Sequence, residues 1–458
     1  MSDQFSRRDM LRLTAAAAGA VALSSVAGPA SAATGSPDLA ERIRGSVRRP
    51  VFAQRAFPIT QYGAVGDGKT DCTGAFAKAI AACTAAGGGQ VVVPGGTFST
   101  GAIRLRSNVE LHLTAGATVK FSTDPAAYPL VLGRWQGIEL MNFSPFIYAY
   151  GEQNIGITGT GILDGQAGSS SWWPWKDKQD ADWAALEAMA TNNVPVAQRV
   201  FGKGHYLRPN FIAPFGCTKV LIQDVTIVNS PMWEINPVLC DSVTVRNVHV
   251  NSLGPNNDGC DPDSCDGVVI SGCTFNTGDD CIAIKSGRNE DGRRVGVPSR
   301  NILIEDCTFQ GGHGGVTIGS EMSGGVSDVV AQRLTMTSPA LQSGLRLKTN
   351  SARGGYITNI HLSHAEVTQL ATAAVLIDFN YDEGAGHDHN PVVSGIHVDN
   401  LHVGKAKQAL DMAGYPNDHI TDVTLTDCTF DTVTSTDTVQ YVDGLVLTNV
   451  TENGKPVK

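Results

Sequence analysis

The hydrophobic positions of the chain follow a repeated eight-residue pattern, apolar-x-apolar-x-x-apolar-x-apolar. Apolar residues two positions apart lie on one face of a β-strand, so each copy predicts two short strands that meet at a bend. Val220, Ile222, Val225 and Ile227 form the first copy. The seven later copies begin at Val243, Val268, Ile302, Val329, Ile360, Ile396 and Val423.

Successive copies begin 23, 25, 34, 27, 31, 36 and 27 residues apart. A constant core with connections of variable length indicates a solenoid, in which each copy pairs with the next. We therefore expect an all-β protein with the fold of a right-handed parallel β-helix. Residues 56–458 are expected to form this single domain.

The start of this domain predicts one helix before the strands, at residues 73–86. Phe76, Ile80 and Cys83 fall on one face of it, at helical spacing. A short amphipathic helix in this place can cover the exposed strand edges at the N-terminal end of the solenoid.

Residues 1–32 are typical of an export signal. Arg7 and Arg8 precede an apolar run at 13–27, and Ala30-Ser31-Ala32 offers small residues for cleavage. The paired arginines resemble a twin-arginine signal. We expect a polar linker at 33–55 and a secreted, extracellular protein that has no membrane contact after signal cleavage.

Composition narrows the class of partner. The net charge of −10 argues against a nucleic-acid ligand, although local Arg and Lys can still bind an acidic substrate. Ten cysteines in an exported chain suggest disulfides, but many occupy repeat positions where small apolar packing serves equally well. Cys72 and Cys83 cannot bridge each other, because eleven helical residues separate them by about 16 Å.

The segment at about 166–209 interrupts the repeat. It holds four of the six tryptophans, which are Trp172, Trp173, Trp175 and Trp183. Two interpretations stay open. The segment is either a loop that packs on the solenoid through its own aromatic rings, or a wall over a cleft that stacks on sugar rings.

Polar residues follow the last apolar position of four consecutive copies and should face one side of the solenoid. They are Asp258, the pair Asp279 and Asp280, His313, and the strand pair Arg346 and Lys348. Neighbouring coils lie about 4.8 Å apart, so these side chains should form one cluster.

Three explanations fit this cluster. Two carboxyl groups can hydrolyse a glycosidic bond, one as acid and one as base, while Arg346 and Lys348 point to one side and hold a substrate carboxylate. Asp258, Asp261 and Asp263 could instead bind calcium, although their spacing is not that of an EF-hand. Some aspartates, Asp263 and Asp266 first, could simply stabilise turns. His313, between two glycines, would orient the acid or be a structural histidine.

Four motifs resemble those of the polygalacturonase family of pectin-degrading glycoside hydrolases, family 28. They are Asn256-Asn257-Asp258, Gly278-Asp279-Asp280, Gly312-His313-Gly314 and Arg346-Leu347-Lys348, in the order that the family has. The resemblance implies a parallel β-helix and an inverting hydrolase that cleaves α-1,4-galacturonosidic linkages in pectin. We expect the protein to be a monomer. It implies no cofactor and no metal.

The resemblance also implies roles for single residues. Asp279 corresponds to the general acid, Asp258 and Asp280 to the pair that activates water, and His313 to the residue that supports the acid. The substrate-binding residues it suggests are Asn256, Arg346, Lys348, Tyr381, Lys285 and Arg288, of which the last three are the looser matches.

Residues 319–325 and the Trp-rich insertion resemble exo-acting bacterial members, so we expect release of units from a chain end. The alternatives are a hydrolase of rhamnogalacturonan or xylogalacturonan, a calcium-dependent pectate lyase on the same fold, and a carbohydrate-binding solenoid without catalysis.

Overall fold

The structure is a computed structural model that describes residues 36–457, and these residues form one compact unit. The signal sequence expected at 1–32 lies outside the described residues. Among the described helices, none has the length and hydrophobicity needed to cross a membrane.

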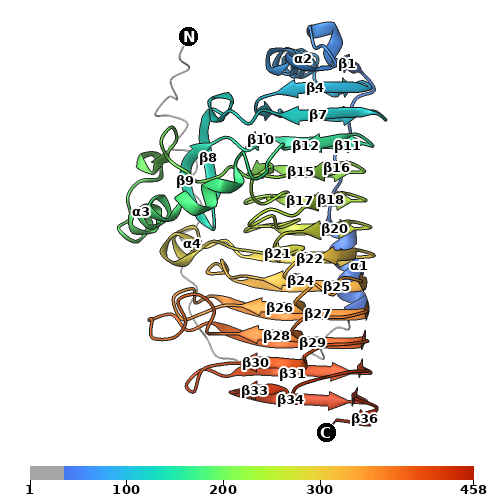
Figure 1. Cartoon of the computed structure of the whole chain (residues 1–458), viewed down its shortest axis with the longest axis vertical. Coiled ribbons are helices and arrows are strands. Elements are labelled where there is room, and N and C mark those ends of the chain that lie inside the picture. The colour runs from blue at the N-terminus through green and yellow to red at the C-terminus, as the bar shows by residue number, and fades with distance from the viewer. Residues whose placement is uncertain (1–35, 458) are drawn as a thin grey trace. The chain divides into compact units, whose positions relative to one another are not determined.

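The described chain winds into a stack of coils whose strands pair in parallel with those of the next coil (Figure 1). Two strips of strands belong to one 24-stranded sheet. The first strip contains β1 (Ala56–Pro58), β3 (Gly89–Val93), β6 (Val109–Leu113), β11 (Gln153–Gly159), β15 (Thr218–Gln223), β17 (Asp241–Arg246), β19 (Asp266–Ser271), β22 (Ser299–Glu305), β25 (Val326–Met336), β27 (Tyr356–Val367), β29 (Val392–Val403), β31 (Ile420–Thr426) and β34 (Val442–Thr448).

The second strip follows the bend, and the long strands β25, β27 and β29 extend into it. It contains β2 (Asp67–Asp71), β4 (Gly96–Thr100), β7 (Ala117–Phe121), β12 (Ile162–Asp164), β16 (Thr226–Val228), β18 (His249–Ser252), β20 (Thr274–Thr277), β23 (Thr308–Gly311), β32 (Thr429–Phe430) and β35 (Thr451–Glu452).

A third strip closes each coil. It contains β5 (Ile103–Arg104), β10 (Ile147–Tyr150), β14 (Ile212–Phe215), β21 (Ile282–Ile284), β24 (Gly314–Ile318), β26 (Ser343–Lys348), β28 (Ala373–Asp378), β30 (Gln408–Ala413) and β33 (Thr438–Gln440). Single bridges through Ile235 and Cys260 connect β14 to β21.

The register of the strands reproduces the repeat of the sequence. Val243 pairs with Val268, which pairs with Ile302, and Val250 pairs with Phe275 in the second strip. The side chains at these positions are buried in one continuous core. The predicted parallel β-helix is therefore confirmed, because equivalent apolar positions of successive copies stack inside the coils.

Helix α2 (Thr73–Ala85) lies at the N-terminal end of the coils, where the sequence predicts a capping helix (Figure 1). Phe76, Ile80 and Cys83 are buried on its inner face. At the other end of the described chain, β36 (Lys455–Pro456) pairs antiparallel with β35.

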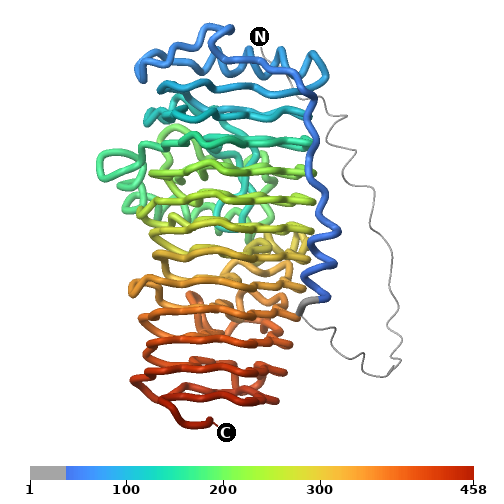
Figure 2. Tube along the Cα trace, turned by 90° about the vertical axis from the view of Figure 1, so that its right-hand side faces the viewer, coloured from blue at the N-terminus to red at the C-terminus, as the bar shows by residue number. Residues whose placement is uncertain are grey.

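The linker expected at 33–55 is wrong in part, because Ser36–Ser46 forms helix α1. Leu39, Ala40 and Ile43 pack on Val269, Leu303 and Val330, which point outward from three successive coils. From α1 the chain runs along the side of the coils to β1 (Figure 2). Burial of this small apolar stripe stabilises a helix that its polar composition does not suggest.

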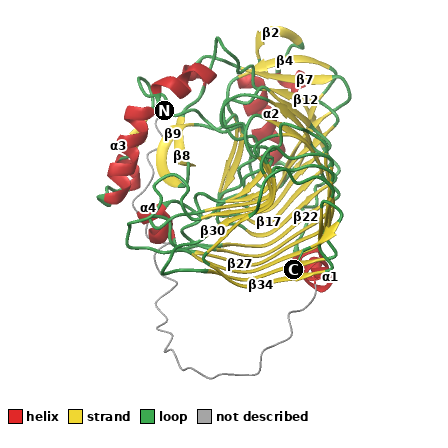
Figure 3. Ribbon diagram, turned by 60° about the horizontal axis from the view of Figure 1, so that its bottom comes forward, coloured by secondary structure: helices red, strands yellow, loops and turns green. Residues whose placement is uncertain are grey.

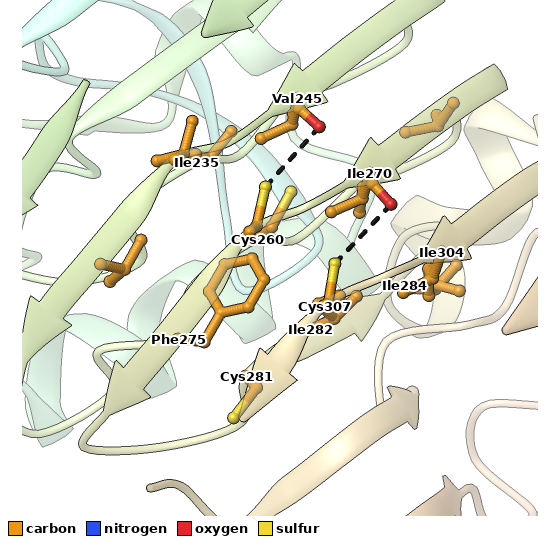
Figure 4. Close-up of a cluster of buried hydrophobic side chains, with 14 of the residues drawn as sticks. Ile235, Val245, Cys260, Ile270, Phe275, Cys281, Ile282, Ile284, Ile304 and Cys307 are labelled. Carbon is orange, nitrogen blue, oxygen red and sulfur yellow. Dashed lines mark hydrogen bonds between the residues drawn. The ribbon is translucent and has the colours of Figure 1, made fainter. Parts of the chain in front are cut away.

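All ten cysteines lie among the described residues, are buried and carry free thiols. Figure 4 shows Cys260, Cys281 and Cys307 packed with Phe275 and isoleucines inside the coils. The sequence left disulfides and small apolar packing open as roles for the cysteines, and the structure shows small apolar packing.

The additional segments gather outside the coils on one side, with α3 (Asp180–Thr191) and α4 (Asn289–Val295) next to a hairpin (Figure 3). The hairpin strands β8 (Leu130–Trp135) and β9 (Ile138–Phe143) are antiparallel, and β13 (Val200–Phe201) pairs with β9. Four short 3-10 helices complete the structure, η1 (Ile59–Tyr62), η2 (Pro125–Ala127), η3 (Trp173–Lys178) and η4 (Val196–Gln198).

Candidate active site

Four neighbouring coils bring the predicted cluster together at one corner of the solenoid. Asp258 follows β18, Asp279 and Asp280 stand between β20 and β21, and His313 stands between β23 and β24. Arg346 and Lys348 lie in β26. One oxygen from each of Asp258, Asp279 and Asp280 lies within 4.8 Å of the others.

Asp280 is held by two cations of the protein. Its Oδ2 accepts a hydrogen bond from Lys348 Nζ at 2.7 Å, and its Oδ1 accepts from Arg346 Nη1 at 3.1 Å and from the Gly314 backbone at 2.7 Å. Burial disfavours the charged carboxylate, but Lys348 and Arg346 outweigh it and lower the pKa of Asp280 below its ordinary value. Asp280 is therefore an anion in the working range of the site.

Asp279 is the most accessible carboxyl group of the three. The Nδ1 atom of His313 lies 2.9 Å from its Oδ1, which also accepts the backbone N–H of Asp280. This contact with Asp279 raises the pKa of His313. Within the described chain both hydrogen bonds go to Oδ1, so Oδ2 is the oxygen left for another partner.

Asp258 is buried, and its Oδ1 has no hydrogen-bond partner among the described residues. Its other oxygen lies 3.9 Å from Lys285 Nζ. Burial first, and then the negative charges of Asp261 and Asp279, raise the pKa of Asp258 well above its ordinary value. Three carboxyl groups this close do not ionise together, so the cluster holds a proton.

A polar cleft of about 320 Å³ opens beside these groups. Its lining residues come from the coils, the hairpin and the insertion, and they are Gln136, Lys176, Trp183, Trp233, Asn256, Asp258, Asp279, Lys285, Arg288, Ser320, Glu321, Lys348, Tyr381 and Asp382. The volume is near the lower end of the usual range for ligand sites, about 300–1,000 Å³.

Four of the predicted substrate-binding residues have protein partners that define their position. The ring of Tyr381 lies 5.1 Å from Lys348 Nζ and 5.8 Å from the Arg346 guanidinium. Asn256 lines the cleft, and its Oδ1 accepts a hydrogen bond from Arg208. Arg346 has a buried Nε without a partner in the described chain.

Lys285 and Arg288 line the cleft but are engaged by carboxylates of the protein. Lys285 Nζ donates to Glu321 at 3.2 Å. Arg288 pairs with Glu383 at 2.8 Å and with Glu187 of α3 at 3.1 Å. Both cations are thus neutralised before a substrate binds.

The Trp-rich insertion packs on the solenoid through its own aromatic rings and also lines the cleft. Trp172 is buried in the main core, near Phe146 and Tyr128. Trp173 lies against the backbone at Gly254, where a Cβ atom would come within 2.2 Å of the indole. Trp183 lines the cleft, with the Arg288 guanidinium 4.8 Å from its ring.

The glycines beside His313 serve the neighbouring coil. A Cβ atom at Gly312, whose φ is +138°, would lie 2.6 Å from the carbonyl oxygen of Asp279. At Gly314 it would lie 2.8 Å from Asp280 Oδ1. The two glycines thus allow a close approach to the coil that carries the aspartates, and the Gly314 N–H donates to Asp280.

Two aspartates of the calcium alternative lie beside cations of the protein. Asp263 is buried and pairs with Arg134 at 2.7 Å, and Asp261 lies 3.8 Å from Lys285. Asp266 binds Arg300 on the surface. Asp263 and Asp266 are structural, but as partners of Arg134 and Arg300 rather than through bonds to their own turns.

Several lining residues were not predicted. Trp233 follows the last apolar position of the copy before Asp258, so the same register argument would have found it. Gln136 lies at the tip of the β8–β9 hairpin, and Gly137 beside it packs on Arg288 and Glu321. No repeat position marks this contact in the sequence.

Comparison with known proteins agrees with this geometry. The family model of glycosyl hydrolases family 28 matches residues 83–451. The chain belongs to glycosyl hydrolases family 28. It is therefore a glycosidase, as the sequence predicted.

Individual relatives share the fold over most of the chain. The structure is similar to a hyperthermoactive exopolygalacturonase from Thermotoga maritima, with 43% identity, a TM-score of 0.87, and coverage of 90% of this chain and 96% of that one. A probable polygalacturonase of Vitis vinifera is 29% identical over 81% of this chain and 73% of its own length. An exo-poly-α-D-galacturonosidase of Dickeya chrysanthemi is 30% identical over 73% of this chain and 58% of its own.

Proposed function

We propose that this family 28 glycosidase hydrolyses α-1,4-galacturonosidic linkages in pectin and releases units from a chain end. The observation that carries the proposal is the carboxylate cluster of Asp258, Asp279 and Asp280 beside the cations Arg346 and Lys348, next to a polar cleft. The polygalacturonases and the exo-acting enzymes among its relatives support the substrate class.

In this proposal Asp279 is the general acid. Its Oδ2 faces no donor of the described chain, and it protonates the leaving glycosidic oxygen as the bond to the anomeric carbon breaks. Asp258 and Asp280 orient a water molecule and take its proton as the water oxygen bonds to that carbon. Because the carboxyl groups are close together, the proton gained on the base side can return to Asp279 for the next turnover.

His313 supports the acid by its hydrogen bond to Asp279 Oδ1, which fixes the carboxyl group with its other oxygen toward the cleft. Arg346, Lys348 and Tyr381 form the proposed site for a galacturonate carboxylate and sugar ring. The positive charges of Arg346 and Lys348 and the aromatic face of Tyr381 suit an acidic sugar better than a neutral one. Asn256 borders the same cleft.

The release of units from a chain end is supported by the walls of the cleft. Trp183 and Lys176 of the insertion, Gln136 of the hairpin and Asp382 of a later loop line it together. Arg288 joins the insertion to that loop through Glu187 and Glu383. Walls from the insertion, the hairpin and the later loop border the cleft, which favours entry of a chain end over passage of a whole polysaccharide.

Product analysis on polygalacturonate in the presence of a chelator tests this function. Saturated monomer or dimer from the start of the reaction, with slow loss of viscosity, is expected. Unsaturated ends that disappear on chelation would show a lyase and contradict the proposal. Mixed oligomers would keep the hydrolase and contradict the exo mode, and Asp279→Asn should abolish cleavage without loss of fold.

We also propose that the protein is secreted by the twin-arginine route and acts as a monomer. Ten buried thiols without a disulfide fit a chain that folds in a reducing compartment before export. The end-covering helix α2, which hinders stacking of coils between molecules, supports the monomer.

A further inference from the structure

We infer that Lys285 is a positioning residue that acts through Asp258, as the buried counter-ion that makes Asp258 available to activate water. This inference rests on the proposed function, since it takes the water-activating role of Asp258 from there. It replaces the substrate-binding role that the sequence suggested for Lys285.

The register of the third strip sets Lys285 and Lys348 in equivalent places. Ile284 pairs with Ile318, and Ile318 pairs with Leu347. The residues that follow these three are Lys285, Gly319 and Lys348, so the two lysines lie in one column, two coils apart. Both are buried, and each faces one carboxylate of the cluster.

The two lysines differ in the number of carboxylates that each one contacts. Lys348 bonds Asp280 directly at 2.7 Å. Lys285 is divided among three carboxylates, Glu321 at 3.2 Å, Asp261 at 3.8 Å and Asp258 at 3.9 Å, and its ammonium lies 4.5 Å from the ring of Trp233. Glu321 therefore takes the best contact, and Asp258 takes the weakest.

The balance of charge at Asp258 follows from this arrangement. Burial raises its pKa, as do the negative charges of Asp261, Asp279 and Asp280, and Lys285 opposes them. Arg208 also interacts with Asp258. Whatever strengthens or weakens the hold of Lys285 on Asp258 should therefore change the pH at which this carboxyl group ionises.

Lys285 and Glu321, which competes with Asp258 for the ammonium, both remain charged. Burial works against the ammonium, but Glu321, Asp261, Asp258 and Asp280 keep the pKa of Lys285 well above its ordinary value. Lys285 and Arg288 lower the pKa of Glu321 to about 2 against the effect of burial. Asp263 and Lys348 complete the charged groups around Lys285.

The experiment is the pH profile of kcat/KM on a short galacturonate oligomer, for wild type, Lys285→Met and Glu321→Gln. Loss of Lys285 should move the acidic limb upward by about one pH unit or more, the usual effect of an opposite charge at this range. Loss of Glu321 should move it downward, because Lys285 then turns to Asp258. Lys285→Arg should restore much of the wild-type profile.

Two results would overturn the inference. An acidic limb that stays in place in both variants, with kcat lower at every pH, would show a merely structural role. A large rise in KM for Lys285→Met with the limb in place would show a substrate ligand. If Lys285→Met does not fold, the downward shift in Glu321→Gln decides, and its absence overturns the inference.

Asp258→Asn separates this inference from the proposed function. If that variant remains active, the role of Asp258 in the proposed function is wrong. If it is inactive while the limb does not move in the other two variants, only the role of Lys285 is wrong. Unchanged unfolding temperatures would show that the variants report on the site.

Discussion

His313 Nδ1 lies 2.9 Å from Asp279 Oδ1, although the two residues are 34 positions apart in the chain. The distance is short because the coils place the residue after one strand directly beside its counterpart in the next coil. The contact joins the one histidine of the cluster to its most accessible carboxyl group.

Replacement of His313 should change the alkaline side of the pH profile. Asp279 raises the pKa of His313 above its ordinary value of 6.5, so the hydrogen bond from protonated His313 is fully present below pH 6.5 and is lost as the pH rises through the raised pKa. His313→Gln should lower kcat about 10- to 100-fold, the value of one charged hydrogen bond. It should also flatten the alkaline limb, as initial rates across pH will show.

His402→Gln is the matched control. His402 is also held between carboxylates, Glu366 and Asp431, but lies on the exterior of the C-terminal coils. Its replacement should leave both limbs in place. An alkaline limb that persists in His313→Gln would show that another group controls it.

Asp279 and Asp280 should differ in their effect on stability. Asp280→Asn leaves Lys348 buried without its partner, which costs about 3–5 kcal/mol, whereas Asp279 is partly exposed and its loss should cost far less. Calorimetric unfolding temperatures of the two variants will compare these costs. Equal losses would contradict the arrangement described for Lys348.

The loss of stability in Asp280→Asn should depend on pH, and the sign of this dependence follows from the pKa of Asp280. Because the pKa of Asp280 is lowered, its stabilising contribution is present above the ordinary value of 3.8 and is lost as the pH falls below it. The difference in unfolding temperature between wild type and Asp280→Asn should therefore be constant near neutrality and decrease in acid.

Arg288→Ala should alter the length of the products. Arg288 joins Glu187 of the insertion to Glu383 of the opposite loop, so its loss should open the cleft and increase the share of longer oligomers in early product profiles. Arg300→Ala, which removes an exposed pair with Asp266, is the control. An unchanged product profile with a raised KM would assign Arg288 to substrate binding instead.

The repeat pattern predicts much of the fold, since apolar residues at alternating positions determine both the strands and their register. Helix α1 was missed because only Leu39, Ala40 and Ile43 are apolar in a polar segment. The surface of the coils on which α1 packs could, however, have been recognised in the sequence. Val269, Leu303 and Val330 occupy the outward position between two inward ones, where a solvated coil would carry polar residues.

The cluster was predicted for the same reason as the strands, because its members occupy one register position. The hairpin at the cleft was not predicted, because Gln136 reaches the cleft from outside the repeat. Glu187 was also missed, since it meets Arg288 from a helix that the repeat does not mark. The partners of Lys285 also escaped prediction. Alternation places its side chain, but whether the ammonium meets a substrate or Glu321 depends on a loop from the next coil.

Ile43→Ala should lower the stability of the protein by about 2–4 kcal/mol, because Ile43 is buried between α1 and the coils. Thermal unfolding, compared with the exposed Arg48→Ala, measures the effect. Equal unfolding temperatures would show that α1 does not stabilise the coils.

The cysteines of the native protein should not react with a thiol reagent, and ten should react after denaturation. Burial raises the pKa of Cys83 and of Cys428 to about 11, which leaves little thiolate at neutral pH. A spectrophotometric thiol count in both states measures this, and fewer than ten reactive thiols in the denatured, unreduced protein would reveal a disulfide.

The position of α1 imposes an order on folding. Leu39, Ala40 and Ile43 find their partners on coils that end with Val330, so this helix cannot dock until most of the chain has been synthesised and those coils have formed. The first described helix of the sequence is thus among the last to reach its final place, and its docking reports that the coils carrying the aspartates of the cluster are complete.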